Sequence, residues 1–427
     1  MGEYSSEELK KKDSELIIRP WWVKPIIITE GKGVYVKDID GKEYIDTASA
    51  FFVLNLGYSH PEVVKAIKDQ AEKVIQTTMY QSSIPMIELT EKLVKITPRN
   101  LTRVFYTAGG AEAVEVATKM ARLYTGKSEI IALKAAYHGT STIASATLTG
   151  IAKTKVGTNP QIPGVYHAAP PYCYRCYYGL TYPECGLTCA YDIERVLKTD
   201  SVGDAAAVLV EPILGAGGAI IPPDPWLREV RKICDEHGLL LIADEVQTGF
   251  ARSGEMFAIE HSGVEPDIMC LSKAVGGGLP QGAVVAREEI AEKFKTVIPP
   301  TFAGNTLACV SGLKTIEVIE KERVWENAAK MGAYFKKKFT EISEWHPSIG
   351  DVRFKGLMGG VELVVDRRTR EPAVDEAKEV TPKLMDLGVI AFPGGISGSV
   401  FRIQPPLNIS KREADKVVDA FDEVLPK

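Results

Sequence analysis

Short apolar runs that each stop at a polar or reactive residue constrain the fold of this chain more than any other feature. Between these runs, apolar residues recur at helical spacing, so strand and helix patterns alternate along the middle of the chain. This alternation is typical of α/β proteins, in which helices connect the strands of a mostly parallel sheet. The clearest runs span residues 130–133, 206–210, 239–243 and 268–271.

The segment around the third run predicts one helix and one strand in detail. Asp224 is placed to cap a helix with Pro225 at its first position, and Gly238 is placed to end that helix. The run 239–243 contains only Leu, Ile and Ala, which is the pattern of a strand buried on both faces. We therefore expect a helix followed directly by a central strand that carries Asp244 at its end.

The polar residues that follow the four runs are expected to share one site. Tyr137, Glu211, Asp244 and Lys273 each come at or shortly after the end of an apolar run. Open α/β sheets bind ligands beyond the carboxyl ends of their strands. The sequence therefore predicts a ligand site at this edge of the sheet.

Residues 105–113, Phe-Tyr-Thr-Ala-Gly-Gly-Ala-Glu-Ala, suggest a phosphate site. They have the pattern of a strand end, a turn of small residues and a helix start. Small residues let the backbone approach a ligand, and the positive end of a helix favours a phosphate group. A tight connection without any ligand gives the same pattern, so this motif alone does not decide the function.

Lys273 and Asp244 combine features that a cofactor enzyme needs. Lys273 leaves a buried strand and is followed by glycines, and burial lowers the pKa of a lysine, as a Schiff-base lysine requires. A buried aspartate such as Asp244 keeps a pyridinium nitrogen protonated, so that the ring acts as an electron sink. The alternatives are a solvated surface lysine and a capping or loop acid.

Seven motifs in one order resemble the class III aminotransferases, in the branch of the ω-aminotransferases and the alanine–glyoxylate type 2 enzymes. Seven motifs together are more specific than any one of them. The resemblance runs from about residue 25 to near the C-terminus. The motifs are AYHG (136–139), VEPI (210–213), LIADEVQTGF (241–250), DI (267–268), SKA (272–274), TFAGN (301–305) and FRIQPPL (401–407).

The resemblance implies an α/β protein of the fold type I group of pyridoxal-phosphate transferases. A large domain of residues 60–310 would carry a mostly parallel, seven-stranded sheet and the cofactor, pyridoxal 5'-phosphate. The N-terminal segment 1–59 would join the C-terminal residues 311–427 in a smaller α+β domain.

The resemblance also implies roles around the cofactor. Lys273 would hold it as a Schiff base and then carry a proton between substrate and cofactor, and Asp244 would pair with the pyridine nitrogen. The other residues that would contact the cofactor are Val246 and Tyr137 at the two ring faces, Gln247 and Glu211 near the ring hydroxyl, and Gly110 and Ala111 at the phosphate. Tyr137 and Val246 are equally compatible with a role in the core.

Further positions concern the substrate and a second subunit. Arg402 would bind a substrate carboxylate, although an arginine here also suits a surface ion pair. Phe51 lies in a segment that often lines the substrate pocket. Thr301 would reach the phosphate of a neighbouring subunit, which implies a homodimer, or a higher assembly, with shared sites. Ala216 replaces the Glu usual in ornithine- and acetylornithine-type relatives, which favours amine and ω-amino-acid transaminases.

The implied reaction is a ping-pong transfer of an amino group to a keto acid, either pyruvate or 2-oxoglutarate. The donor would be an ω-amino acid, an amine or an alanine-like compound, and the sequence does not choose among them. An amino-acid racemase or a decarboxylase is the alternative, because both would use Lys273 and Asp244 on the same scaffold.

Composition and the N-terminus bear on partners and location. The formal net charge of -5 and pI near 5.9 do not favour nucleic acid or an anionic membrane. The polar first dozen residues read as a solvated tail, and they lack the apolar stretch of a signal peptide. We therefore expect a cytoplasmic protein without nucleic-acid or membrane partners.

Four of the seven cysteines fall in one short window with the spacing C-x2-C-x8-C-x3-C. Four thiolates at such spacing can converge on zinc or an iron–sulfur cluster. Free thiols or local disulfides in a packed surface loop explain the spacing equally well, and transamination needs no metal, so we assign no metal ligand. The four are Cys173, Cys176, Cys185 and Cys189.

Overall fold

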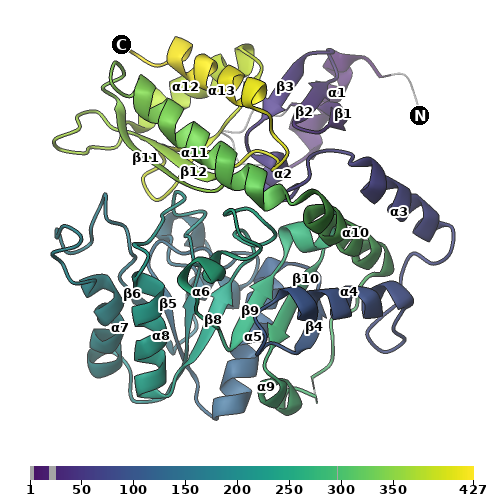
Figure 1. The fold of residues 1–427 in the computed structure, drawn as a ribbon, viewed down its shortest axis with the longest axis vertical. Helices are drawn as coiled ribbons and strands as arrows, with labels where there is room; N and C mark the ends of the chain where they lie inside the picture. The colour runs from purple at the N-terminus through teal and green to yellow at the C-terminus, as the bar shows by residue number, and fades with distance from the viewer. Residues whose placement is uncertain (1–3, 19–25, 296) are drawn as a thin grey trace.

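The structure, a computed structural model, describes residues 4–18, 26–295 and 297–427. The named strands form one seven-stranded sheet and two four-stranded sheets. Figure 1 shows the large sheet with its helices in the lower part of the view and the two smaller sheets above it.

The large sheet has the strand order β4-β10-β9-β8-β7-β5-β6. β10 is antiparallel to both of its neighbours, whereas the pairs from β9 to β6 are parallel. The prediction of a mostly parallel sheet with seven strands is therefore confirmed. The strands are β4 (Arg103–Thr107), β5 (Glu129–Leu133), β6 (Val165–Ala168), β7 (Ala205–Val210), β8 (Leu240–Asp244), β9 (Ile268–Leu271) and β10 (Gly282–Ala286).

Both faces of the large sheet are buried, which explains its continuous apolar strands. In β8, Leu241 and Ala243 pack in one cluster with residues of α7 and α8, whereas Leu240 and Ile242 pack in another with residues of α5. When helices cover both faces of a parallel sheet, neither face contacts water, so side chains on both faces are apolar.

The helices of this region connect the strands or cover the sheet (Figure 1). Three short 3₁₀ helices accompany them: η1 (Ala152–Lys155), η2 (Ala258–Ser262) and η3 (Lys273–Gly276). The α-helices are α3 (Pro61–Ala71), α4 (Ile84–Ile96), α5 (Gly110–Thr125), α6 (Ile143–Leu148), α7 (Thr188–Thr199), α8 (Trp226–His237), α9 (Glu288–Lys293) and α10 (Thr306–Glu322).

The helix predicted before β8 is present, but its cap is not. α8 begins at Trp226 with Pro225 as the N-cap residue, and no side chain caps it. The carboxylate of Asp224 instead lies 3.6 Å from the ammonium of Lys355. Gly238 ends the helix in the left-handed conformation, as predicted.

The smaller sheets combine the two ends of the chain. One consists of β1 (Ile28–Lys32), β2 (Tyr35–Asp38), β3 (Glu43–Asp46) and β13 (Val389–Ile390). The other consists of β11 (Ile349–Lys355), β12 (Met358–Leu363), β15 (Val400–Ile403) and β14 (Pro393–Gly394). The helices α11 (Val324–Ile342), α12 (Val374–Asp386) and α13 (Lys411–Val424) accompany these sheets.

The N-terminal segment is solvated, as predicted, but it also forms a helix that the sequence analysis did not predict. Residues 6–16 form α1 (Ser6–Leu16), with Ser5 and Glu8 in a reciprocal capping box. No residue of this helix is buried, so it is polar as expected, and its contacts include those of Ser6 and Lys10 with Asp40. The capping box therefore favours a helix here even though the segment has no apolar face to pack against the core.

The turn α2 (Ser49–Phe52) has an unusual backbone. All four residues have positive φ, from 40° at Ser49 to 70° at Phe52. Left-handed backbone is unfavourable for residues with a side chain, so such strain persists only where surrounding contacts impose it. The carboxylate of Asp46 accepts hydrogen bonds of 2.7 Å from the backbone amides of Ala48 and Ala50 and so fixes the start of the turn.

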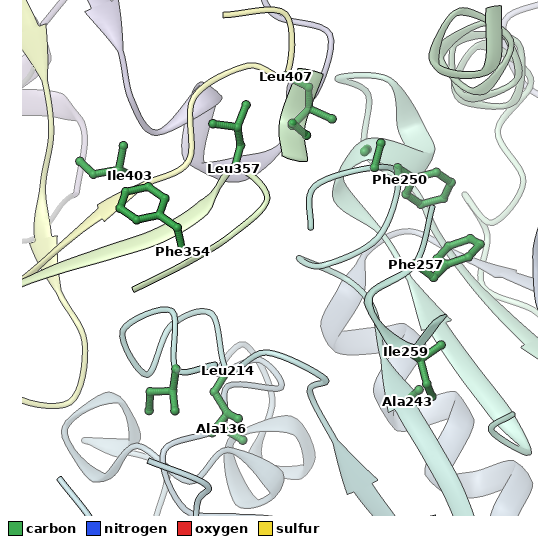
Figure 2. Packing of buried hydrophobic residues seen from close by; sticks show 14 of the residues in the cluster. Ala136, Leu214, Ala243, Phe250, Phe257, Ile259, Phe354, Leu357, Ile403 and Leu407 are labelled. Carbon is green, nitrogen blue, oxygen red and sulfur yellow. The ribbon is translucent and has the colours of Figure 1, made fainter. Parts of the chain in front are cut away.

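One apolar core joins the large sheet to the smaller ones (Figure 2). It includes Ala243 and Phe257 beside the large sheet and Phe354 and Ile403 from the sheet of β11, β12 and β15. The domain limits 1–59, 60–310 and 311–427 stay a prediction, and the limit at 310 falls inside α10.

Candidate active site

The carboxyl ends of three neighbouring strands present three of the predicted site residues. Asp244 is the last residue of β8, Glu211 follows β7 directly, and Lys273 begins η3 after β9. These strands are adjacent and parallel in the sheet. The topology therefore brings together residues that are up to 62 positions apart, from 211 to 273 in the chain.

Asp244 is buried and held by two contacts. Its Oδ2 lies 2.7 Å from Nδ1 of His138, and its Oδ1 accepts a hydrogen bond of 3.0 Å from the backbone amide of Val246. Nδ1 must carry the hydrogen when Asp244 is ionised. The other ring nitrogen, Nε2 of His138, is buried without a hydrogen-bond partner among the described residues. Sequence reasoning gave His138 no role of its own and missed this pairing, although His138 stands next to Tyr137 in the AYHG motif.

The amine of Lys273 points into the same site. Its Nζ donates a hydrogen bond of 3.2 Å to Oε1 of Gln247. Burial lowers its pKa to about 8, while Asp244 and Glu211 act in the opposite direction and the Arg402 and Arg252 cations lower it further. The fraction of this lysine that is a free amine near neutral pH is therefore far larger than for an ordinary lysine.

Glu211 is buried between two backbone segments. Its carboxylate accepts hydrogen bonds from the amides of Tyr137, at 2.7 Å, and Gly215, at 2.8 Å. Burial raises its pKa to about 7, the nearby Asp244 adds to this, and His138 opposes it. Glu211 thus fixes the position of the Tyr137 segment.

The start of α5 lies against this site. A Cβ added at Gly110 would stand 2.9 Å from Cγ1 of Val246, so only glycine allows this approach. Gly110 and Ala111 are the first residues of the 16-residue helix, where backbone amides have no partner within the helix. The preceding amide of Ala108 donates to Glu112 instead, at 2.7 Å.

Arg402 on β15 brings a partly buried cation toward the site. Its guanidinium lies 4.7 Å from the ring centroid of Phe52, and no ion pair forms between it and any described acid. Its Nε is buried without a hydrogen-bond partner in the described chain. Burial lowers its pKa to about 10, which Glu211 partly counteracts. An unpaired buried cation is costly, so this position suits an anionic ligand.

The remaining predicted residues are exposed to solvent. Tyr137 is 38% exposed and Phe51 is 69% exposed, so neither is a core residue in the single chain. Thr301 is exposed too, and its carbonyl accepts a hydrogen bond of 3.2 Å from Nε2 of Gln76.

Two buried side chains that the sequence did not single out support the site. Gln404 accepts a hydrogen bond of 2.9 Å from Nε2 of Gln247, which positions the partner of Lys273. Arg252 is fully buried and donates to Asn55 Oδ1 at 2.8 Å and to the carbonyls of Leu357 and Pro405. The motif FRIQPPL pointed to the first of these two residues, but no local signal pointed to the second.

The four clustered cysteines lie away from these residues. All four are free thiols, and they line one cavity of about 20 Å³ between the segment 170–176 and the start of α7. Within the described residues, no group of three or more His, Cys, Asp or Glu side chains is arranged to hold a metal ion.

Comparison with known proteins identifies the family. The model of the class III aminotransferases matches residues 19–425. Leucine/methionine racemase of Thermococcus litoralis is 39% identical, covering 94% of this chain and 90% of that protein. Alanine–glyoxylate aminotransferase 2 homolog 2 of Arabidopsis thaliana is 38% identical, covering 95% and 83%. Acetylornithine aminotransferase of Methanosarcina mazei is 40% identical, covering 96% and 95%.

Solved structures agree with this family. An ω-transaminase of Pseudomonas jessenii in complex with PMP superposes with a TM-score of 0.91 at 30% identity, covering 97% of each chain. An (S)-enantioselective ω-transaminase of Thermomicrobium roseum superposes with a TM-score of 0.92 at 32% identity and covers 100% of both chains.

The side chains present fit pyridoxal phosphate. A lysine with a lowered pKa and a buried carboxylate lie at adjacent strand ends, and helix-start amides lie beside Val246. Aminotransferases predominate among these relatives, which favours amino transfer over racemisation. The chain belongs to the class III aminotransferase family and is a pyridoxal-phosphate-dependent aminotransferase of fold type I.

Proposed function

We propose that this enzyme moves an amino group from an ω-amino acid, an amine or an alanine-like donor to a keto acid, pyruvate or 2-oxoglutarate. One observation carries the proposal: Arg402 is a partly buried cation, with a buried Nε, that no described acid pairs, at the site that holds Lys273 and Asp244. A carboxylate-bearing acceptor supplies the missing anion. Ala216 provides no carboxylate that would compete for Arg402.

Lys273 is the residue that we propose moves the proton. Bound pyridoxal phosphate supplies a covalent attachment point and an electron sink for the substrate carbon. The free amine of Lys273 then accepts the proton from that carbon and returns it at the neighbouring position. Its lowered pKa, near 8, suits both steps at neutral pH, and its bond to Gln247 keeps it in place.

Asp244 and its neighbours hold the ring in this proposal. Asp244 faces the pyridine nitrogen and keeps it protonated, and His138 holds the carboxylate in position. Val246 would pack on one face of the bound ring and Tyr137 on the other. Gln247 and Glu211 lie near the ring hydroxyl, and the amides of Gly110 and Ala111 bind the phosphate.

A homodimer with shared sites is also part of the proposal. Thr301 would contact the phosphate bound to the partner subunit, and Phe51 would line the substrate pocket. The exposed apolar side chains near Thr301 support this, because monomers rarely leave such groups in water. These side chains are Ile75, Tyr80, Ile84, Ile87 and Phe302.

No helix among the described residues is long and apolar enough to cross a membrane. We also propose a cytoplasmic location without nucleic-acid or membrane partners, and the net charge of -5 supports this.

The test uses the purified holoenzyme with pairs of single donors and single keto acids, and it follows both products by chromatography. The proposal predicts equal amounts of the new amino acid and of the carbonyl derived from the donor. A donor that is consumed without any keto acid, or that yields carbon dioxide, contradicts it. Sedimentation tests the dimer, which a fully active monomer would exclude.

Racemisation remains the second candidate function because a racemase is 39% identical to this chain. The two reactions share Lys273 and Asp244, and they differ in the need for a keto acid. Loss of optical activity of leucine or methionine, at an undiminished rate without keto acid, would favour the racemase.

A further inference from the structure

The four-cysteine window contains a turn that brings two thiols together. Cys173 and Cys176 flank a turn at Tyr174 and Arg175. The end residues of such a turn have Cα atoms less than about 7 Å apart, and a disulfide spans about 4.4 to 6.8 Å between Cα atoms. Both thiols line the same cavity, and Cys173 is exposed. The backbone therefore already holds this pair within bridging range.

The cavity also affects the reactivity of these thiols. Burial raises the pKa of Cys173, and the neighbouring Cys185 and Cys176 raise it further. The pKa of Cys189 rises to about 12, mainly through burial. Because only the thiolate attacks a disulfide, exchange at Cys173 is slow at neutral pH and faster at alkaline pH.

The residues inside the turn connect it to the sheet of β11, β12 and β15. Nε of Arg175 donates to Oε1 of Glu362 at 2.5 Å, and the carbonyl of Tyr174 accepts a hydrogen bond from Arg370. Tyr172, just before the turn, hydrogen-bonds to the same Glu362. Glu362 is fully buried on β12 and Arg175 is partly exposed, so their ion pair joins the turn to a buried acid in a distant part of the chain.

The contacts continue from Glu362 toward Arg402. Arg353 donates to Oε2 of Glu362 at 2.9 Å and to the carbonyl of Gly218 at 2.7 Å. Along β15, Val400 pairs with Glu362, and Arg402 lies two residues further, opposite Gly360. The strand that carries the proposed carboxylate-binding arginine is thus next to the strand on which the turn is docked.

We propose that Cys173 and Cys176 form a thiol–disulfide switch that acts on the acceptor site. One thiolate attacks a small-molecule disulfide and releases one thiolate from it. The second cysteine thiolate then attacks the mixed disulfide, forms the Cys173–Cys176 bond and releases the second small thiolate. Two electrons pass from the protein to the small disulfide, and two protons go to solvent or to the released thiolates.

Closing the bridge tightens the turn and weakens the contact between Arg175 and Glu362. This consequence rests on the proposed role of Arg402, whereas the bridge itself does not. Because the affected strand holds Arg402, the KM for the keto acid should rise about threefold or more, the size typical of coupling between distant sites. The kcat at saturating keto acid should change little.

The experiment treats the reduced holoenzyme with oxidised glutathione, blocks the remaining thiols with iodoacetamide, and maps the peptides by mass spectrometry. We expect a Cys173–Cys176 bridge, two fewer free thiols, and faster formation at about pH 9 than at about pH 7. Dithiothreitol should restore both the thiols and the KM. A Cys185→Ser variant should still form the bridge, and Cys176→Ser should not.

Several results would overturn the proposal. The pair could stay reduced, or Cys173 could pair with Cys185 or Cys189 instead. If the protein contained about one zinc or iron per chain, and blocking the four thiols released this metal, the cysteines would form a metal site and not a switch. A bridge that forms without changing the KM would exclude the link to Arg402. The thiol measurements need no catalysis, so failure of the proposed reaction stays separate from failure of the switch.

Discussion

Single residues carry most of the chemistry, and their charges can be followed in solution. Lys273, Asp244 and Glu211 lie at three adjacent strand ends, and the surroundings of Lys273 and Glu211 shift the pKa values of these two groups. The pKa of Lys273 falls to about 8 and that of Glu211 rises to about 7, in both cases chiefly through burial. Burial disfavours the charged form of each group, which explains the opposite directions.

Recombination of the apoenzyme with pyridoxal phosphate should depend on pH through Lys273. Its amine is protonated and unreactive well below its pKa and free above it, so the rate should rise with pH, with its midpoint near 8. Stopped-flow absorbance between pH 6 and pH 10 measures this. A midpoint near the ordinary lysine value of 10.5 would show that the amine is not desolvated.

Substitution of Arg402 should affect one substrate class selectively. Arg402→Met removes charge-assisted hydrogen bonds worth about 1.5 to 3 kcal/mol, so kcat/KM for the keto acid should fall roughly 10- to 100-fold. The reaction with an amine donor that lacks a carboxylate should be nearly unchanged. Arg412→Met, at an exposed position of α13, is the matched control. An equal loss for both substrates would contradict carboxylate binding.

The sequence predicted these residues because each one follows an apolar run or stands in a family motif. It did not predict the contact between His138 and Asp244, which are 106 positions apart. It also missed Arg252, whose partners come from three separate segments, among them Asn55 and Leu357. Such contacts depend on tertiary packing, and no local pattern encodes them.

Helices and strands determine the positions of these residues. The backbone packs tightly at the connection between β4 and α5. Gly109 and Gly110 stand side by side there, but only one of them is crowded. A Cβ at Gly109 would meet nothing within 4 Å, and its φ of −174° is ordinary extended backbone. A Cβ at Gly110 would press on Val246 at 2.9 Å.

Gly110→Ala should therefore weaken cofactor binding, whereas Gly109→Ala should not. The crowding costs about 1 to 3 kcal/mol, which corresponds to a roughly 5- to 150-fold higher Kd for pyridoxal phosphate. Fluorescence titration of the two apoenzymes gives both values. Equal affinities for the two variants would show that the start of α5 does not contact the phosphate.

Sequence patterns predicted some helices and strands and failed to predict others. The apolar runs located β5, β7, β8 and β9 because strands buried on both faces must be continuously apolar. The helix α1 escaped prediction because it has no buried face. The left-handed turn α2 could not be predicted, since Ser49, Ala50, Phe51 and Phe52 all prefer other backbone conformations.

The whole molecule depends on contacts between the large sheet and the smaller ones. Glu362 receives hydrogen bonds from Tyr172 and Arg175 on one side and from Arg353 on the other. It is fully buried, so its carboxylate has no water to replace a lost partner. Removing its charge would leave Arg353 with Asp351 as its remaining acidic partner.

Glu362→Gln should lower the free energy of unfolding by roughly 3 kcal/mol, because it removes the charge of the buried carboxylate that Arg175 and Arg353 share. Urea denaturation of the holoenzyme, followed by circular dichroism, measures the change. Glu371→Gln, at an exposed position before α12, serves as the control and should stay within about 0.5 kcal/mol of the parent. If Glu362→Gln lowered the free energy of unfolding as little as the control does, Glu362 and its arginine partners would be hydrated and would not stabilise the fold.

The visible spectrum of the holoenzyme tests most directly whether Lys273 drives an amino transfer. The parent enzyme should be yellow, should bleach when a suitable amino donor is added without keto acid, and should recover when pyruvate or 2-oxoglutarate follows. Lys273→Ala should neither bleach nor recover at a comparable rate. Donors that leave the parent band unchanged while an amino acid loses its chirality would contradict amino transfer and point to racemisation.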